Sequence, residues 1–102
     1  MKIKMVLLCA MGMSSSMIVK SILSASEPRG LEIELPSHPV VHYKELDYSD
    51  VDLILLAPQV RNQKSEIETY CEGVPVVQIG MREYGLIKGE EILEQALKEL
   101  KK

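Results

Sequence analysis

The sequence predicts an α/β domain of the three-layer doubly wound type, in which helices cover both faces of a four-stranded parallel sheet. Two observations lead to this fold class. Four short apolar runs are spaced along the chain, and helical patterns separate and follow them. This alternation gives the order βαβαβαβα, and right-handed crossovers then place helices on both faces of the sheet. With 102 residues, we expect residues 1–102 to form a single domain whose ligands bind at the carboxyl ends of the strands.

The predicted strands differ in how much of each is apolar. The runs at 3–8 and 51–56 are almost continuous in Ile, Leu, Val and Met, as is typical of strands buried on both faces. The run at 31–35 alternates apolar residues with glutamates, which predicts an edge strand that Pro36 ends. The run at 74–79 has Pro75 near its start, where a missing N–H does least harm to a strand.

Helical signals fall between and after these runs. An apolar stripe over residues 17–23 follows a serine cluster, and Pro28 and Gly30 close that helix. Residues 61–70 predict a further helix, and a short helix is expected around 43–46. From Gly89 to the end of the chain, apolar residues repeat with the 3.6-residue period of an amphipathic helix.

The segment that carries chemistry joins the first predicted strand to the first predicted helix. It reads Cys9, Ala10, Met11, Gly12, Met13, Ser14, Ser15, Ser16. Its small residues let backbone N–H groups converge, and a helix N-terminus adds unpaired donors and the positive end of the helix dipole. These surroundings favour an anion, which can be a thiolate, a phosphate or a phosphoryl group on sulfur. We therefore predict Cys9 as a nucleophile in a phosphate-binding loop at 10–16; the alternative is a cysteine that only packs at a strand end.

The residue six positions after Cys9 separates two kinds of phosphate chemistry. A low-molecular-weight cysteine phosphatase has an arginine at this position, which clamps the phosphoryl oxygens, and an aspartate that acts as general acid. Here the position holds Ser15, and no aspartate precedes a proline. Such a loop should hold a phosphoryl group without promoting its hydrolysis, which favours a carrier. A small phosphatase or arsenate reductase, and a non-enzymatic regulatory domain of the same fold, are the alternatives.

Three parts of the sequence together resemble one family. They are Cys9 to Val19, Val51 to Val60, and Tyr84-Gly85 with Gly89 before the last helix. They are similar to enzyme IIB components of the bacterial phosphotransferase system (PTS), in the lactose/cellobiose branch that includes N,N'-diacetylchitobiose. The resemblance implies one IIB domain over residues 1–102, with strand order 2-1-3-4 as in low-molecular-weight tyrosine phosphatases. Ala57 departs from the family pattern, which has glycine there.

The resemblance also implies a phosphotransferase mechanism. A histidine-phosphorylated IIA protein would pass its phosphoryl group to Cys9, and the phosphocysteine would then dock on a membrane IIC permease and phosphorylate the sugar. The branch implies a β-linked disaccharide such as cellobiose, chitobiose or lactose. Met11 and Met13 would form an adaptable apolar rim. Gln59 would be an accessory hydrogen-bond donor, unless it is only part of a turn, and no metal or cofactor is implied.

Composition and the remaining candidate residues exclude other functions. A net charge of -3 argues against binding nucleic acid or an anionic membrane. No apolar run approaches the roughly 20 residues that cross a bilayer, and no targeting segment is evident. We therefore expect a cytoplasmic protein, with a monomer as the default state. The resemblance implies that it is transiently at the inner face of the membrane. His38 and His42 are interpreted as surface residues, and Cys71 as a packing residue.

Overall fold

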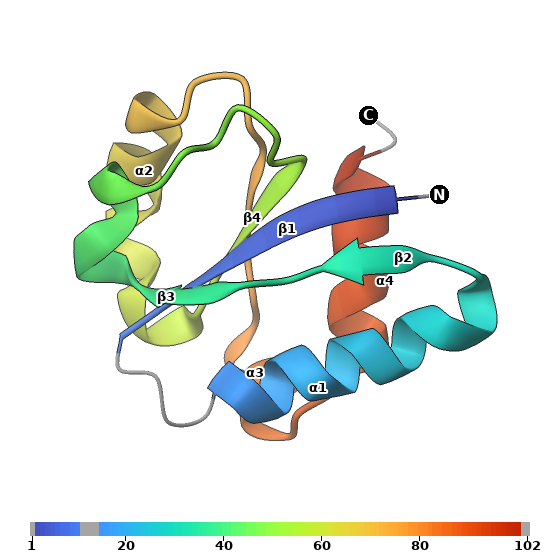
Figure 1. Ribbon diagram of the computed structural model, residues 1–102. Helices are drawn as coiled ribbons and strands as arrows, with labels where there is room; N and C mark the ends of the chain where they lie inside the picture. Colours follow the sequence, from blue (N-terminus) through green and yellow to red (C-terminus); the bar gives the residue numbers. More distant parts are fainter. Residues whose placement is uncertain (1, 11–14, 101–102) are drawn as a thin grey trace.

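The computed structural model describes residues 2–10 and 15–100, and five parallel strands among them form the sheet (Figure 1). The strands are β1 (Lys2–Cys9), β2 (Glu32–Glu34), β3 (Ser37–Pro39), β4 (Leu53–Leu56) and β5 (Val76–Gln78). Their order is β2-β1-β4-β5, and β3 also pairs with β1. The four predicted runs therefore lie in the order 2-1-3-4, which confirms the predicted fold class, and β3 is an additional short strand.

The helices complete a three-layer arrangement. They are α1 (Ser15–Ser26), α2 (Lys64–Tyr70), α3 (Met81–Gly85) and α4 (Gly89–Leu100), with the 3-10 helices η1 (Glu27–Arg29), η2 (Val40–Glu45) and η3 (Pro58–Gln63). Figure 1 shows α1 and α4 together on one side of the sheet and α2 on the other. The helix predicted at 61–70 is split into η3 and α2, and the short helix predicted at 43–46 is η2, which begins earlier. The sequence prediction does not include α3.

The strands β2 and β3 follow one another along the same side of β1. The register with β1 is the same on both sides of the gap between them. Pro36 has no N–H, so the ladder loses a bond there and the strand is divided. Its carbonyl nevertheless accepts a hydrogen bond from the Leu7 backbone N at 3.0 Å. The strand β2 finishes before Pro36, as predicted, but the chain stays beside β1 as far as Pro39, the register partner of Cys9.

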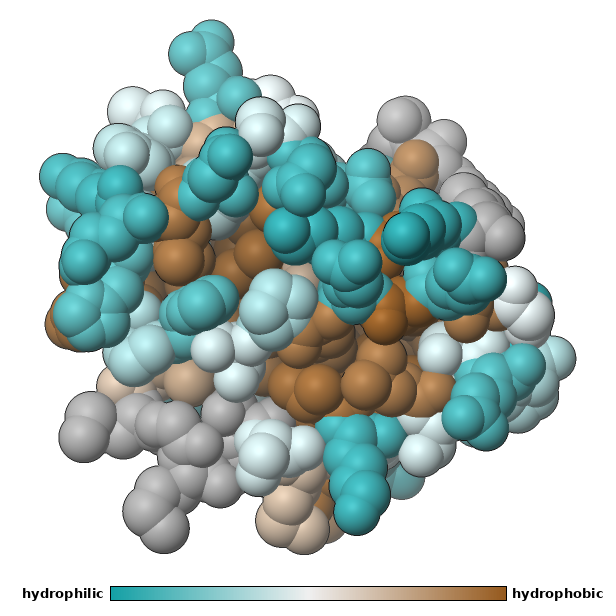
Figure 2. All heavy atoms as spheres, viewed as in Figure 1, coloured by the Kyte–Doolittle hydropathy of each residue, from teal (hydrophilic) through white to brown (hydrophobic). Residues whose placement is uncertain are grey.

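The sheet supplies the centre of the core, and the helices cover it with aliphatic side chains. Strand residues that are completely buried are Met5, Leu7, Leu8, Leu53, Ile54, Leu55 and Leu56. The helices add buried isoleucines, namely Ile18, Ile22, Ile67 and Ile92. Figure 2 shows a further apolar area between β2 and α1, on the side of the molecule where the edge strand lies. Because β1 and β4 are enclosed by these layers, their ends are held in fixed positions.

The two ends of the sheet have different neighbours. Figure 1 shows that β1 starts, and α4 finishes, at one end of the sheet. At the opposite end, the last residues of β1 lie near the start of α1 and near η3 and α3. We call this second end the carboxyl edge, because the parallel strands finish there. No helix in the described part of the chain is both long and apolar enough to cross a membrane.

Candidate functional site

Cys9 is the last residue of β1, and only 2% of it is exposed. Its Sγ lies 3.6 Å from the backbone carbonyl oxygen of His38 in β3, to which the thiol donates a hydrogen bond. A carbonyl oxygen can only accept, so the thiol is the donor in this contact. The Cys9 side chain is therefore directed at the edge strand.

Helix α1 begins at Ser15, at the carboxyl edge. Of the predicted phosphate loop, Ala10 and Ser16 are described and exposed, whereas residues Met11, Gly12, Met13 and Ser14 lie outside the described residues. A helix of 12 residues carries unpaired N–H groups and the positive end of its dipole at its start. The start of α1 therefore brings a field favourable to anions to the edge at which Cys9 lies.

The end of β4 places a second loop beside Cys9. Leu56 is the register partner of Leu8, and the Ala57 backbone N donates to the Leu8 carbonyl oxygen at 2.9 Å. Ala57 is completely buried, but Gln59, at the second position of η3, is exposed. Gln59 thus shares the carboxyl edge with Cys9, and its accessory role stays a prediction.

Three exposed apolar side chains also belong to the carboxyl edge. Met17 in the first turn of α1 is 56% exposed, Val41 at the start of η2 is 75% exposed, and Met81 at the start of α3 is 69% exposed. We call these three residues the apolar rim. No pattern in the sequence groups these three residues, because each belongs to a different segment. The one signal that each carries is an apolar residue just after a strand end or a helix start. Large exposed apolar side chains so placed are suited to contact another protein.

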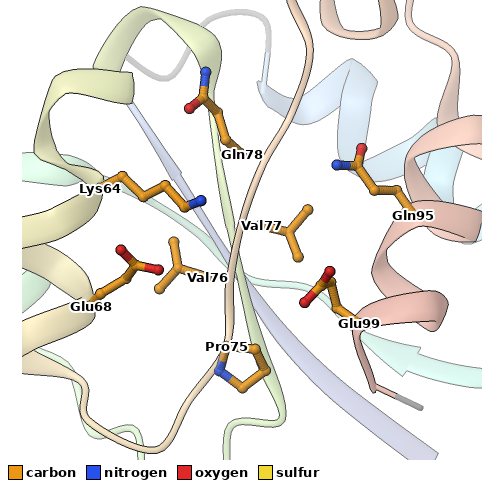
Figure 3. A pocket seen from close by; sticks show the side chains of 8 residues that line it. All are labelled: Lys64, Glu68, Pro75, Val76, Val77, Gln78, Gln95 and Glu99. Carbon is orange, nitrogen blue, oxygen red and sulfur yellow. The ribbon is translucent and has the colours of Figure 1, made fainter. Parts of the chain in front are cut away.

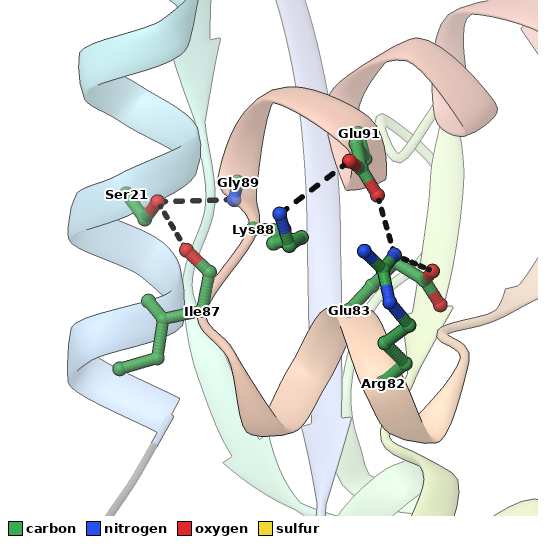
Figure 4. A network of polar contacts seen from close by, with 7 residues as sticks. All are labelled: Ser21, Arg82, Glu83, Ile87, Lys88, Gly89 and Glu91. Atoms are coloured by element: carbon green, nitrogen blue, oxygen red, sulfur yellow. Dashed lines mark hydrogen bonds and ion pairs between the residues drawn. The ribbon is translucent and has the colours of Figure 1, made fainter.

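A hydrogen-bond network fixes α1 against α4 (Figure 4). The Ser21 hydroxyl donates to the Ile87 carbonyl oxygen at 3.1 Å and accepts from the Gly89 backbone N at 3.0 Å. It therefore satisfies one of the free N–H groups at the start of α4 from a neighbouring helix. A Cβ on Gly89 would lie 2.4 Å from Ser21, so the close approach of the two helices requires glycine. This contact sets the position of α1, and thus of the start of the helix at the carboxyl edge.

The aspartates of the chain lie at the opposite end of the sheet. They are Asp47, Asp50 and Asp52, in the segment that leads into β4. Asp52 accepts a hydrogen bond from the Lys4 backbone N at 2.9 Å, and Asp50 pairs with the Lys4 Nζ at 3.0 Å. Since Lys4 is near the start of β1, these carboxylates are far along the strand from Cys9. The general acid of a cysteine phosphatase is therefore not supplied by an aspartate here.

The second cysteine has different surroundings. Cys71, directly after α2, is 4% exposed, and its thiol is hydrogen-bonded with Tyr48. Burial raises the pKa of the Cys71 thiol, an effect that its contact with Tyr48 partly opposes. Burial also raises the pKa of Tyr48, whose hydroxyl donates to the Tyr43 carbonyl oxygen at 2.6 Å. These contacts agree with the packing role predicted for Cys71.

A groove of about 600 Å³ lies along the outer side of β5, between α2 and α4, apart from the candidate site (Figure 3). Its lining residues are Lys64, Glu68, Pro75, Val76, Val77, Gln78, Gln95 and Glu99. They include no cysteine or histidine, and β4 separates β5 from β1. Among the described residues no three His, Cys, Asp or Glu side chains gather as a metal site.

Comparison with known proteins agrees with this geometry. Residues 4–95 match the family described as "PTS system, Lactose/Cellobiose specific IIB subunit". The PTS system galactose-specific EIIB component of Lactococcus lactis subsp. cremoris (strain MG1363) is 31% identical over 96 residues, which cover 88% of this chain and 89% of that protein.

Solved structures give the same result. The lactose-specific IIB component domain from Streptococcus pneumoniae has a TM-score of 0.80 and 25% identity, covering 96% of this chain and 97% of that one. A YwlE mutant from Bacillus subtilis, which has the low-molecular-weight tyrosine phosphatase fold, has a TM-score of 0.58 and 18% identity over 98% of this chain and 99% of that one; this likeness concerns the fold alone. The chain belongs to the lactose/cellobiose-specific IIB family of the PTS, whose members are phosphotransferase components of sugar transport.

Proposed function

We propose that Cys9 is the phosphoryl carrier of this IIB component, accepting the group from a phosphohistidine of IIA and passing it to a sugar during IIC-mediated uptake. IIB components of the PTS work with IIA and IIC partners. The observation that carries the proposal is the position of Cys9. It is the last residue of the central strand β1, at the edge where α1 starts. The other cysteine of the chain, Cys71, lies instead within a tyrosine cluster after α2.

The first transfer exchanges one bond to phosphorus for another. Cys9 loses its proton and leaves the His38 carbonyl oxygen, and the thiolate attacks phosphorus as the N–P bond of the donor breaks. The histidine nitrogen keeps the electron pair of that bond and takes up a proton, which balances the one lost by Cys9. In the second transfer a sugar hydroxyl forms the O–P bond, the sulfur keeps the pair of the S–P bond, and the hydroxyl proton is released.

The surroundings of Cys9 favour transfer over hydrolysis. Phosphoryl transfer is accelerated chiefly by positioning and by donors that stabilise the phosphoryl oxygens, which loop 10–16 and the start of α1 would supply. The residue six positions after Cys9 is Ser15, and the aspartates lie at the other end of the sheet. A phosphocysteine at this edge would meet neither the arginine nor the aspartate acid of a cysteine phosphatase. This supports the carrier over the phosphatase alternative.

The apolar rim supports docking of two different partners in turn. Met17, Val41 and Met81 would add to the rim that Met11 and Met13 are predicted to form, and flexible methionines adapt to unlike surfaces. We further propose that residues 1–102 act as a single cytoplasmic IIB domain, monomeric and needing no metal or cofactor, that meets the permease at the inner face of the membrane. The family description favours a β-linked disaccharide such as lactose, cellobiose or chitobiose as the sugar.

The test is incubation of the protein with a histidine-phosphorylated IIA protein, followed by intact-mass and peptide analysis. We expect an adduct of about 80 Da on Cys9 that persists after the donor is removed. Cys9→Ser should abolish the stable thiophosphate, and hydrolysis of an aryl phosphate by the wild-type protein should be negligible.

Two results would contradict the proposal. Rapid hydrolysis of the aryl phosphate with no isolable adduct would favour the phosphatase alternative. Neither adduct nor hydrolysis, with a donor that phosphorylates another IIB protein in parallel, would favour the regulatory domain.

A further inference from the structure

The Cys9 loop has no arginine, but one arginine stands on the neighbouring loop. Arg61 lies in η3, directly after β4, and it is exposed. Its Nη1 donates a hydrogen bond to the Pro58 carbonyl oxygen at 3.4 Å, so the side chain folds back toward the start of η3. A guanidinium has five N–H donors, and this contact uses one.

The backbone contacts place this side chain near Cys9. Ala57 follows Leu56, the register partner of Leu8, and therefore lies across from Cys9. Adjacent strands are about 4.8 Å apart, and Pro58 is one residue further along the chain. With its hydrogen bond to Pro58, the guanidinium of Arg61 is on the order of 10 Å from the Cys9 backbone, close to the Debye length of roughly 8 Å in physiological salt.

The positive charge of Arg61 is not neutralised within the described residues. Among the other lysines and arginines there, four pair with carboxylates, namely Lys4, Arg29, Arg82 and Lys88. For Arg61, no carboxylate of the described ranges 2–10 and 15–100 lies within the 4.0 Å limit of an ion pair. Its contact is with a neutral carbonyl, so its full charge and its remaining donors face the solvent at the carboxyl edge.

We propose that Arg61 recognises the phosphorylated form of the donor, giving the histidine-phosphorylated IIA protein an advantage over the unphosphorylated one. This inference rests on the proposed function of Cys9. A phosphoryl group carries close to two negative charges, and this chain carries a net charge of -3, so an unpaired cation at the docking edge offsets repulsion where the phosphoryl group arrives. Because Arg61 lies outside the Cys9 loop, it attracts the phosphoryl group without forming the clamp of a phosphatase.

The experiment measures binding with transfer blocked. In a Cys9→Ala background, the dissociation constants of phosphorylated and unphosphorylated IIA are compared at low and at high salt. We expect Arg61→Gln to lower the preference for phosphorylated IIA by about 3- to 10-fold at low salt, and the difference to shrink at high salt. Lys98→Gln is the matched control, because it removes the same charge from an exposed position near the end of α4, away from the carboxyl edge.

The outcomes separate this inference from the proposed function. Arg61→Lys keeps the charge and should keep the preference within about 3-fold of the parent. Two results would overturn the role of the charge. In one, Arg61→Gln and Lys98→Gln show the same preference for phosphorylated IIA. In the other, Arg61→Lys loses as much of that preference as Arg61→Gln does. With Cys9 intact, Arg61→Gln should still reach full phosphorylation, more slowly. If wild-type Cys9 accepts no phosphoryl group, the proposed function fails and this inference fails with it.

Discussion

The two cysteines of this chain are almost equally buried, and yet their surroundings differ. Cys9 is 2% exposed and Cys71 is 4% exposed. Cys9 ends a central strand, and its thiol points at a backbone carbonyl close to the start of α1. Cys71 follows α2 and is packed against Tyr48, where burial raises the pKa of its thiol.

If Cys9 is the carrier proposed above and Cys71 a packing residue, burial alone does not separate the two roles. The useful difference is which groups the sulfur meets after it loses its proton. At the carboxyl edge, the start of α1 brings unpaired backbone donors, which favour an anion. Beside Tyr48, the surroundings are mostly apolar and favour the neutral thiol.

The largest expected effect separates the two thiols directly. Cys9→Ala should reduce sugar phosphorylation, measured with IIA and permease membranes, by about 10³-fold or more, because the carrier atom is lost. Cys71→Ala should leave that rate within about twofold of wild type and lower the free energy of unfolding by about 1 kcal/mol. A Cys71→Ala protein that stays folded but loses sugar phosphorylation would show that the distinction drawn here is wrong.

The second prediction concerns the helix contact that positions the Cys9 side of the sheet. Gly89→Ala places a Cβ against Ser21, so α1 and α4 must separate, and we expect a loss of about 2–4 kcal/mol in the free energy of unfolding. Gly85→Ala is the matched control, because a Cβ there meets nothing within 4 Å, and it should change stability by less than about 1 kcal/mol.

Amide hydrogen exchange shows which elements Gly89→Ala destabilises. In Gly89→Ala, amide exchange should accelerate in α1 and α4 more than in α2, on the Cys71 side. Equal denaturation midpoints for Gly89→Ala and Gly85→Ala would mean that the close helix approach contributes little to stability.

The third prediction concerns how the free energy of unfolding depends on pH through Cys71 and Tyr48. Burial raises the folded-state pKa of both Cys71 and Tyr48. The unfolded chain therefore loses these protons at lower pH, so it binds fewer protons than the folded chain above about pH 9. Stability from this pair is present below that pH and is lost as the pH rises toward the folded-state pKa values.

Urea denaturation at pH 8 and at pH 10 measures this loss. The fall in midpoint between the two values should be smaller in Cys71→Ala and in Tyr48→Phe than in wild type. Ser24→Ala, which removes an exposed group that does not titrate, should keep the wild-type fall. An unchanged fall in the double variant of Cys71 and Tyr48 would show that other groups control alkaline stability.

The sequence predicts the interior of the fold better than its edges. The runs at 3–8 and 51–56 predict the central strands because continuous apolar residues are needed where both faces are buried. The segment β3 contains His38 and Pro39, which carry no strand pattern, and it is held by the register that β2 has already set. The helix α3 has only 5 residues, too few for a recognisable period.

The candidate site is predicted in the same uneven way. Cys9 is identified because a strand, a loop of small residues and a helix start follow each other in the sequence. The contact of Cys9 with the His38 carbonyl oxygen cannot be identified in this way, and neither can the apolar rim. Each joins segments separated by dozens of residues. Arg61 is likewise visible in the sequence only as part of a helix, and its position relative to Cys9 depends on the pairing of β1 with β4.

The separation of the two ends of the sheet has a practical consequence. The start of β1 and the end of α4 lie at the end opposite Cys9 (Figure 1). An affinity tag, a fluorophore or a surface tether attached at either place would therefore leave the carboxyl edge open. Immobilised in this way, the protein would present Cys9 and its rim to solution, so that IIA and permease could be offered to the same molecules one after the other.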